Sequence, residues 1–172
     1  LTITQILRKE GVVGKFVEYF GPAVASMKLA DRALVANMSP EYGATMGFFP
    51  IDDVTLTFLR QTGRTDEEIA LVERYTKEQQ LFYRASDPAP SYNKVLRLDL
   101  GTVEPCMAGP KRPQDRVPLR ILKQAFEQSL RAPVAERGFG LSEEKLAQTA
   151  VVPGDGQGCS IAHGAVAIAA IT

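Results

Sequence analysis

The chain has 172 residues, which is enough for one large domain or two small ones. Hydrophobic residues make up 45% of the chain, and 20 basic residues balance 20 acidic ones, as is typical of a soluble globular protein. This neutral balance excludes a strongly basic protein that binds polyanions through its net charge. It gives no argument for a nucleic-acid or membrane partner, although it leaves a local basic patch possible.

Several helices are predicted along the chain from apolar spacing and end signals. Helical spacing of apolar residues predicts a helix over residues 2–10, and good helix formers predict another over residues 29–41. A glycine follows each of them closely, where helices commonly end. Asp52 is expected to begin a third helix, and Thr65 starts a capping-box sequence before a fourth.

Strands are predicted between these helices. β-branched and aromatic residues between turn-forming residues predict strands at 15–20 and 45–49, and clear two-residue alternation predicts one at 94–99. Residues 109–113 are proline-stiffened and extended, and a further helix is expected from about 119 to 130. The alternation of strand and helix predicts an α/β fold, with one domain over residues 1–104 and an incomplete one over 105–172.

The two ends suggest that the chain belongs to a longer polypeptide. It begins at Leu1 without an initiator methionine or a signal-like segment. It ends in an apolar run, residues 165–172, which is too short to span a bilayer and predicts a buried strand or the approach to one. We therefore expect both ends to be internal.

The cysteines and the histidine give little reason to expect a metal site. Cys106 and Cys159 lie far apart without the spacing of a zinc or cluster site, and they are typical of reduced residues in the cytoplasm, although one disulfide stays open. His163 lies in an apolar neighbourhood, which favours a structural role. The alternating glycines of residues 153–158 lack the context of a phosphate-binding loop and favour a surface turn.

Two other groups of polar residues are candidates for function. Asn37 and Glu41 are four positions apart on a predicted helix, so an amide and a carboxylate share one face and could orient a hydroxyl or water, although such pairs also face solvent or cap helices. Lys111, Arg112 and Arg116 lie on a stiff backbone that could present them to phosphate or carboxylate groups. A solvated crossing between domains is the favoured alternative for that basic segment.

Several blocks of sequence resemble the aconitase family, in the branch that includes bacterial aconitase A and the iron regulatory protein. The resemblance covers nearly the whole chain in order. The final segment is similar to the strand that leads into the Ser-Cys-Thr-Asn-Thr motif of the family. The blocks are Gly-Val-Val-Gly-Lys-Phe-Val-Glu at 11–18, Ala-Asp-Arg at 30–32, Ala-Asn-Met-Ser-Pro-Glu-Tyr-Gly-Ala-Thr at 36–45, Gly-Pro-Lys-Arg-Pro-Gln-Asp at 109–115, and residues 162–172.

The resemblance implies a four-domain hydro-lyase that interconverts citrate and isocitrate through cis-aconitate. It implies a 4Fe-4S cluster held by three cysteines that lie beyond Thr172, and this chain would supply domain 2 and the beginning of domain 3. Asn37 and Glu41 match the active-site asparagine and glutamate of the family. Ser39 stands where the iron regulatory protein has a cysteine, and Cys106 and Cys159 match no cluster ligand.

The same resemblance leaves two other functions open. Dehydratases that act on 2-methylcitrate and 2-methylisocitrate share most of these motifs. Proteins of the iron regulatory type bind RNA stem-loops after losing the cluster, and Arg8, Lys111 and Arg112 lie in regions that face RNA in that resemblance. Neutral net charge argues against strong indiscriminate RNA binding. The resemblance also implies that the full-length protein is a monomer.

Overall fold

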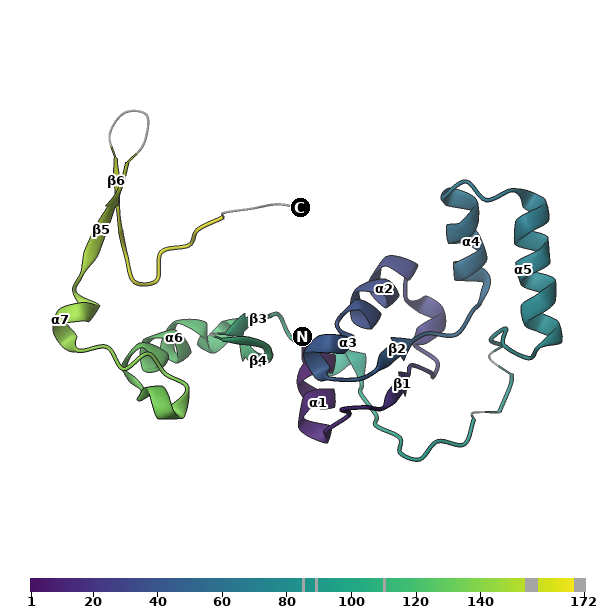
Figure 1. The fold of residues 1–172 in the computed structure, drawn as a ribbon, viewed down its shortest axis with the longest axis horizontal. Helices are drawn as coiled ribbons and strands as arrows, with labels where there is room; N and C mark the ends of the chain where they lie inside the picture. Colours follow the sequence, from purple (N-terminus) through teal and green to yellow (C-terminus); the bar gives the residue numbers. More distant parts are fainter. Residues whose placement is uncertain (85, 89, 110, 154–157, 169–172) are drawn as a thin grey trace. The chain divides into compact units, whose positions relative to one another are not determined.

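The computed structural model describes residues 1–172 except residues 85, 89, 110, 154–157 and 169–172. Contacts between residues divide the chain into two compact units (Figure 1). The first comprises Leu1–Glu104 with Arg112–Arg116, and the second comprises Pro105–Lys111 with Val117–Thr172. Each unit mixes helices with a small sheet, which confirms the predicted α/β fold.

The first unit contains a parallel pair of short strands. Val17 in β1 (Phe16–Glu18) is opposite Gly47 in β2 (Met46–Phe48), so the strands predicted at 15–20 and 45–49 are confirmed. Parallel strands require a crossover connection, which is helical here. The connection contains η1 (Val24–Ser26), α2 (Leu29–Asn37) and α3 (Ser39–Tyr42).

The first helix, α1 (Thr2–Glu10), ends as its sequence predicts. Gly11 has φ 77° and ψ 57°, a left-handed conformation that glycine adopts without a Cβ penalty, and its amide donates to the Leu7 and Arg8 carbonyls. One face of α1 contributes to a small core formed by Leu7, Val12 and Tyr42. This core joins α1 to the end of α3.

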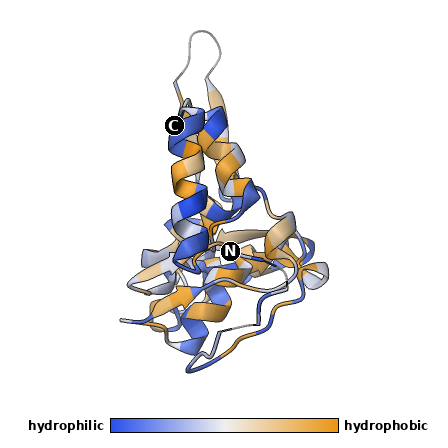
Figure 2. Cartoon of the chain, turned by 90° about the vertical axis from the view of Figure 1, so that its right-hand side faces the viewer, coloured by the Kyte–Doolittle hydropathy of each residue, from blue (hydrophilic) through white to orange (hydrophobic). Residues whose placement is uncertain are grey.

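A helical hairpin follows β2, and both of its helices begin with a capping box. α4 (Asp53–Gln61) is capped by Asp52, and α5 (Asp66–Glu78) is capped by Thr65, whose hydroxyl accepts from the Glu68 amide. These helix starts confirm the predictions. Apolar and polar residues alternate along the helices (Figure 2). Leu56 of α4 and Ile69 of α5 form a second core with Phe82, which follows α5.

The strand predicted at 94–99 is wrong. These residues have no regular secondary structure, and both Val95 and Leu96 are exposed, at 45% and 39%. An alternating pattern becomes a strand only where a neighbouring strand supplies hydrogen bonds, and none of the described strands pairs with this segment. The segment leads into η2 (Leu100–Thr102).

The strand β3 (Cys106–Gly109) belongs to the second unit, whereas most of β4 (Arg112–Pro118) belongs to the first. The expected extended conformation around residue 112 is confirmed. The helix predicted from about 119 to 130 is present, with a 3-10 turn at its start. The helical elements are η3 (Leu119–Ile121), α6 (Leu122–Arg131), η4 (Val134–Glu136) and α7 (Glu143–Leu146).

An antiparallel ribbon follows α7. β5 (Thr149–Val152) pairs with β6 (Cys159–Ala162), and every residue of the two strands is exposed. The sequence predicts that the C-terminal apolar run is a buried strand or the approach to one. Residues 165–168 form no strand, and Val166 and Ile168 are 93% and 82% exposed, so a buried strand over these residues is wrong. The last four residues of the apolar run, and most of the glycine-rich turn at 153–158, lie outside the described residues. Within the described part of the chain, none of the helices is long and apolar enough to cross a membrane.

Candidate functional site

Asn37 and Glu41 lie on either side of a break between two helices, which corrects the single helix predicted over residues 29–41. α2 ends at Asn37, and α3 begins at Ser39. Pro40 has no amide hydrogen to continue the helical ladder toward the Ala36 carbonyl. The Ser39 hydroxyl donates to that carbonyl instead, at 2.6 Å. The two side chains are therefore placed by a proline-induced break and not by one continuous helical face.

Glu41 has a buried carboxylate oxygen that no described residue hydrogen-bonds. Its side chain is half-buried, and among the described residues its Oε2 atom has no hydrogen-bond donor. Asn37, by contrast, is exposed. A buried carboxylate oxygen without a hydrogen bond carries a desolvation cost that a hydroxyl or water donor would relieve. Glu41 is therefore prepared to accept a hydrogen bond from a bound molecule.

Three hydroxyl groups lie beneath the helix break. Tyr42 is 0% exposed, and its hydroxyl is 2.8 Å from Ser39 Oγ and 3.1 Å from the Tyr19 hydroxyl. Burial, followed by the hydrogen bond to Tyr42, raises the pKa of Tyr19 well above its ordinary value. Tyr19 therefore stays a neutral hydroxyl donor across the physiological pH range. The sequence did not indicate this cluster, because Tyr19 and Tyr42 are 23 positions apart and only the packing of α3 against the segment after β1 brings their hydroxyls together.

The basic residues singled out from the sequence have different surroundings. Lys111 donates to the Gly138 carbonyl at 3.2 Å and lies 5.7 Å from the centre of the Phe139 ring. Arg112, its neighbour, is exposed at the start of β4 and belongs to the first unit. Lys111 is thus engaged within the second unit, whereas Arg112 presents its charge to solvent.

Arg8 is exposed on α1, which contacts β4 within the first unit. The Gln5 amide donates to the Gln114 carbonyl at 3.4 Å, and Arg116 Nε donates to the Thr2 hydroxyl at 3.1 Å. These contacts place Arg8 and Arg112 on adjoining elements.

The described residues do not fit an iron-sulfur cluster. Cys106 is half-buried and Cys159 is exposed, and both are free thiols. Within the described ranges, no group of three or more His, Cys, Asp or Glu residues could hold a metal ion. His163 Nε2 instead lies 3.1 Å from the Lys145 carbonyl at the surface, so the structural role predicted for this histidine fits its contact.

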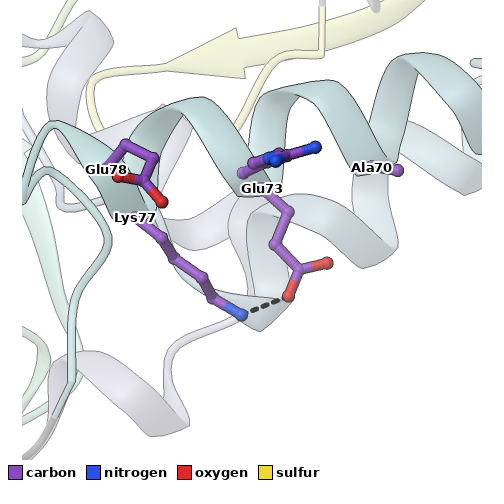
Figure 3. Close-up of a pocket in the computed structure, with 5 residues that line it drawn as sticks. Ala70, Glu73, Lys77 and Glu78 are labelled. Atoms are coloured by element: carbon purple, nitrogen blue, oxygen red, sulfur yellow. Dashed lines mark hydrogen bonds and ion pairs between the residues drawn. The ribbon is translucent and has the colours of Figure 1, made fainter.

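Two hollows elsewhere in the first unit do not include the candidate residues. One has a volume of about 910 Å³ and lies among α1, β1 and residues 92–100, but neither Asn37 nor Glu41 lines it. The other is a shallow hollow on one face of α5, where the Lys77–Glu73 ion pair lies at the surface (Figure 3). An exposed ion pair on a single helix is typical of a solvated face.

Comparison with known proteins identifies close similarity over the whole chain. Residues 1–172 match the family model described as the aconitase family (aconitate hydratase). Aconitate hydratase A of Thermus thermophilus is 56% identical over 173 residues, and the enzymes of the same name from Deinococcus radiodurans and Staphylococcus aureus are 51% and 50% identical over 172 and 173 residues. Each alignment covers 100% of this chain but 19% of the relative.

Proposed function

Because this chain belongs to the aconitase family, we propose that it forms part of an aconitate hydratase. The proposed enzyme is a hydro-lyase of the tricarboxylic acid cycle that converts citrate reversibly to isocitrate through cis-aconitate. Relatives of that name, 50–56% identical across the chain, support the proposal. Since the chain spans 19% of those relatives, the activity is proposed for the longer protein, with this chain as its domain 2 and the start of its domain 3.

The proposed cofactor is a 4Fe-4S cluster whose ligand cysteines lie outside this chain, because the described residues lack the necessary donors. When bound, such a cluster supplies an iron with an open coordination position that acts as a Lewis acid. The contribution proposed for this chain comes from its own side chains at the break between α2 and α3.

The buried Oε2 atom of Glu41 is the observation that carries the proposed site. A substrate hydroxyl or a water molecule would donate to this oxygen and make the hydrogen bond that the described residues do not supply. A carboxylate in this position can hold and orient the hydroxyl that is lost and regained during dehydration and rehydration. The exposed amide of Asn37, at the end of α2, would contribute a second polar contact.

Replacement of Glu41 by glutamine in the complete enzyme is expected to lower turnover by on the order of 100-fold, because glutamine cannot take up a proton. Cluster content, measured as iron per protein and by visible absorbance, should change little. The matched control is Glu78→Gln on the exposed end of α5, which should leave turnover unchanged. Normal turnover in Glu41→Gln would remove Glu41 from the mechanism. Assays with both citrate and 2-methylcitrate would distinguish the two substrates.

We propose RNA binding by the cluster-free protein as a second function, supported by the exposed Arg8 and Arg112 on adjoining elements. The Arg112→Ala change should weaken binding of a stem-loop several-fold and reduce the salt dependence by about one counterion, because one phosphate contact is lost. Filter binding over a salt series measures both effects. Lys111→Ala should have the smaller effect, since Lys111 already contacts Gly138 and Phe139. Identical salt slopes for Arg112→Ala and the unaltered protein would refute this function for Arg112.

We further propose that the longer protein is a cytoplasmic monomer. The two free cysteines support the compartment, because intracellular thiols stay reduced. The resemblance to the family supports the monomeric state.

A further inference from the structure

We infer that a chain of buried hydroxyl groups beneath α3 positions Glu41, and that Tyr42 is its central positioning residue. This inference rests on the proposed function, because Glu41 is the group that the chain would orient. The hydroxyls come from Tyr19, Tyr42 and Ser39, and we call them the hydroxyl chain.

The hydrogen bonds of the hydroxyl chain have a single direction. Ser39 has one hydroxyl proton, and it is donated to the Ala36 carbonyl at 2.6 Å. Ser39 Oγ must therefore accept from the Tyr42 hydroxyl, which lies 2.8 Å away. Tyr42 in turn accepts from the Tyr19 hydroxyl at 3.1 Å. The single Tyr42 proton has two acceptors within reach, Ser39 Oγ at 2.8 Å and the Val35 carbonyl at 3.4 Å, and the shorter contact favours Ser39.

The end of the hydroxyl chain is the last turn of α2. The Ala36 carbonyl accepts from Ser39, and the Val35 carbonyl lies 3.4 Å from the Tyr42 hydroxyl. Asn37 follows these carbonyls directly, and Glu41 precedes Tyr42 directly. The hydroxyl chain therefore holds both sides of the helix break on which the two candidate residues lie.

The other end of the hydroxyl chain is anchored beside the sheet. The Tyr19 amide donates to the Phe48 carbonyl at 3.0 Å, and its ring stacks on Phe49 with centroids 4.4 Å apart. β2 leaves room for the hydroxyl chain only because residue 47 is glycine. A Cβ at that position would lie 2.1 Å from the Tyr42 hydroxyl. The position of the Glu41 backbone is thereby tied to the sheet and not only to a four-residue helix.

A functional role for Tyr42 predicts a loss of turnover that a purely structural role does not. Tyr42→Phe in the complete enzyme keeps the ring and removes the hydroxyl, so a small displacement of Glu41 should lower kcat by roughly tenfold or more. The KM for citrate should stay within about twofold, because ground-state binding is retained. The matched control is Thr76→Val, which removes another buried hydroxyl, on α5, and should leave kcat unchanged.

A double-mutant cycle tests whether Tyr42 acts through Glu41. In a Glu41→Gln background, adding Tyr42→Phe should lower kcat by less than about twofold, since the group to be positioned is already inactive. Independent, multiplicative losses would overturn the inference. A Tyr42→Phe enzyme with normal kcat would also overturn the inference. If Glu41→Gln has a low kcat in that case, the proposed function of Glu41 still stands. If Glu41→Gln has normal turnover, the proposed function and the inference both fail.

A second variant keeps the inference testable if Tyr42→Phe does not accumulate as folded protein. Tyr19→Phe removes only the first donor of the hydroxyl chain, from a side chain that is half-buried. Its kcat should fall by a smaller factor, and the loss should again disappear in the Glu41→Gln background. A normal kcat for folded Tyr19→Phe would overturn the role of the hydroxyl chain.

Discussion

Replacement of Arg32 by methionine is expected to destabilise the first unit by about 3–5 kcal/mol, because it leaves Asp52 buried without its counter-charge. The two residues are 2% and 6% exposed. Two nitrogens of the Arg32 guanidinium donate to the two carboxylate oxygens of Asp52, at 2.9 and 2.8 Å. The remaining guanidinium contacts are to the backbone carbonyls of Met27 and Val24.

The loss should extend beyond the ion pair, since Asp52 also caps α4. One of its oxygens accepts from the Val54 and Thr55 amides, at 3.1 and 3.2 Å. Arg32 thus connects η1, α2 and the start of α4 through a single planar group. Hydrogen exchange of the α4 amides in the longer protein would measure the local free energy of opening.

The exposed pair of Arg60 and Asp66 provides the matched control for Arg32. Its atoms are 3.6 Å apart, and the two side chains are 61% and 91% exposed. Arg60→Met should therefore change the free energy of unfolding by less than about 0.5 kcal/mol. Equal exchange rates in Arg32→Met and Arg60→Met would contradict a dominant role for the buried pair.

Replacement of Gly47 by alanine is expected to destabilise the first unit by about 3 kcal/mol, at the upper end of ordinary overpacking. The new Cβ would lie 2.1 Å from the Tyr42 hydroxyl and 3.0 Å from Ser39 Oγ. Tyr42 is fully buried, so its ring cannot move aside without disturbing the core that it forms with Leu7 and Val12. The midpoint temperature of thermal unfolding and kcat should both fall, because the Tyr42 hydroxyl that the new Cβ displaces is part of the hydroxyl chain.

Gly101→Ala is the control for Gly47, because Gly101 has an exposed position in a 3-10 turn. Its nearest obstacle would be the exposed Asp99 side chain at 3.2 Å, which needs to shift by only a few tenths of an ångström and can keep its hydrogen bond to the Gly101 amide. The stability of this variant should stay within about 0.5 kcal/mol of the unaltered protein. Similar losses in both alanine variants would show that close approach at Gly47 is not the cause.

Local signals were sufficient to predict several helix starts, the end of α1 and the fold class. The capping box at Thr65 satisfies its own amides within three residues, and Gly11 adopts a left-handed conformation that depends on one backbone angle. Both outcomes follow from short-range sterics and hydrogen bonds, so the sequence contains all the information required. The blocks of sequence that resemble the aconitase family, including the one that contains Asn37 and Glu41, were likewise recognisable without coordinates.

Local pattern was not sufficient where the outcome depended on a distant partner. The alternation at residues 94–99 predicted a strand, but a strand needs a neighbour, and the described strands do not provide one. The helix predicted over residues 29–41 was broken because Pro40 lacks an amide hydrogen and the Ser39 hydroxyl takes the open carbonyl. Pro40 and Ser39 are visible in the sequence, but the good helix formers at residues 29–36 favoured the prediction of one continuous helix.

The sequence alone therefore determined where α1, α2, α4 and α5 begin and where α1 ends, which α/β class the elements form and which family they resemble, because neighbouring residues decide these features. Only the tertiary structure decided that Arg32 meets Asp52 across 20 positions and that Tyr19 meets Tyr42 across 23. It also decided that Glu41 buries an oxygen that has no hydrogen-bond partner in the described part of the chain. Burial and long-range hydrogen bonds depend on how elements pack, and no local pattern specifies which side chains packing will bring together.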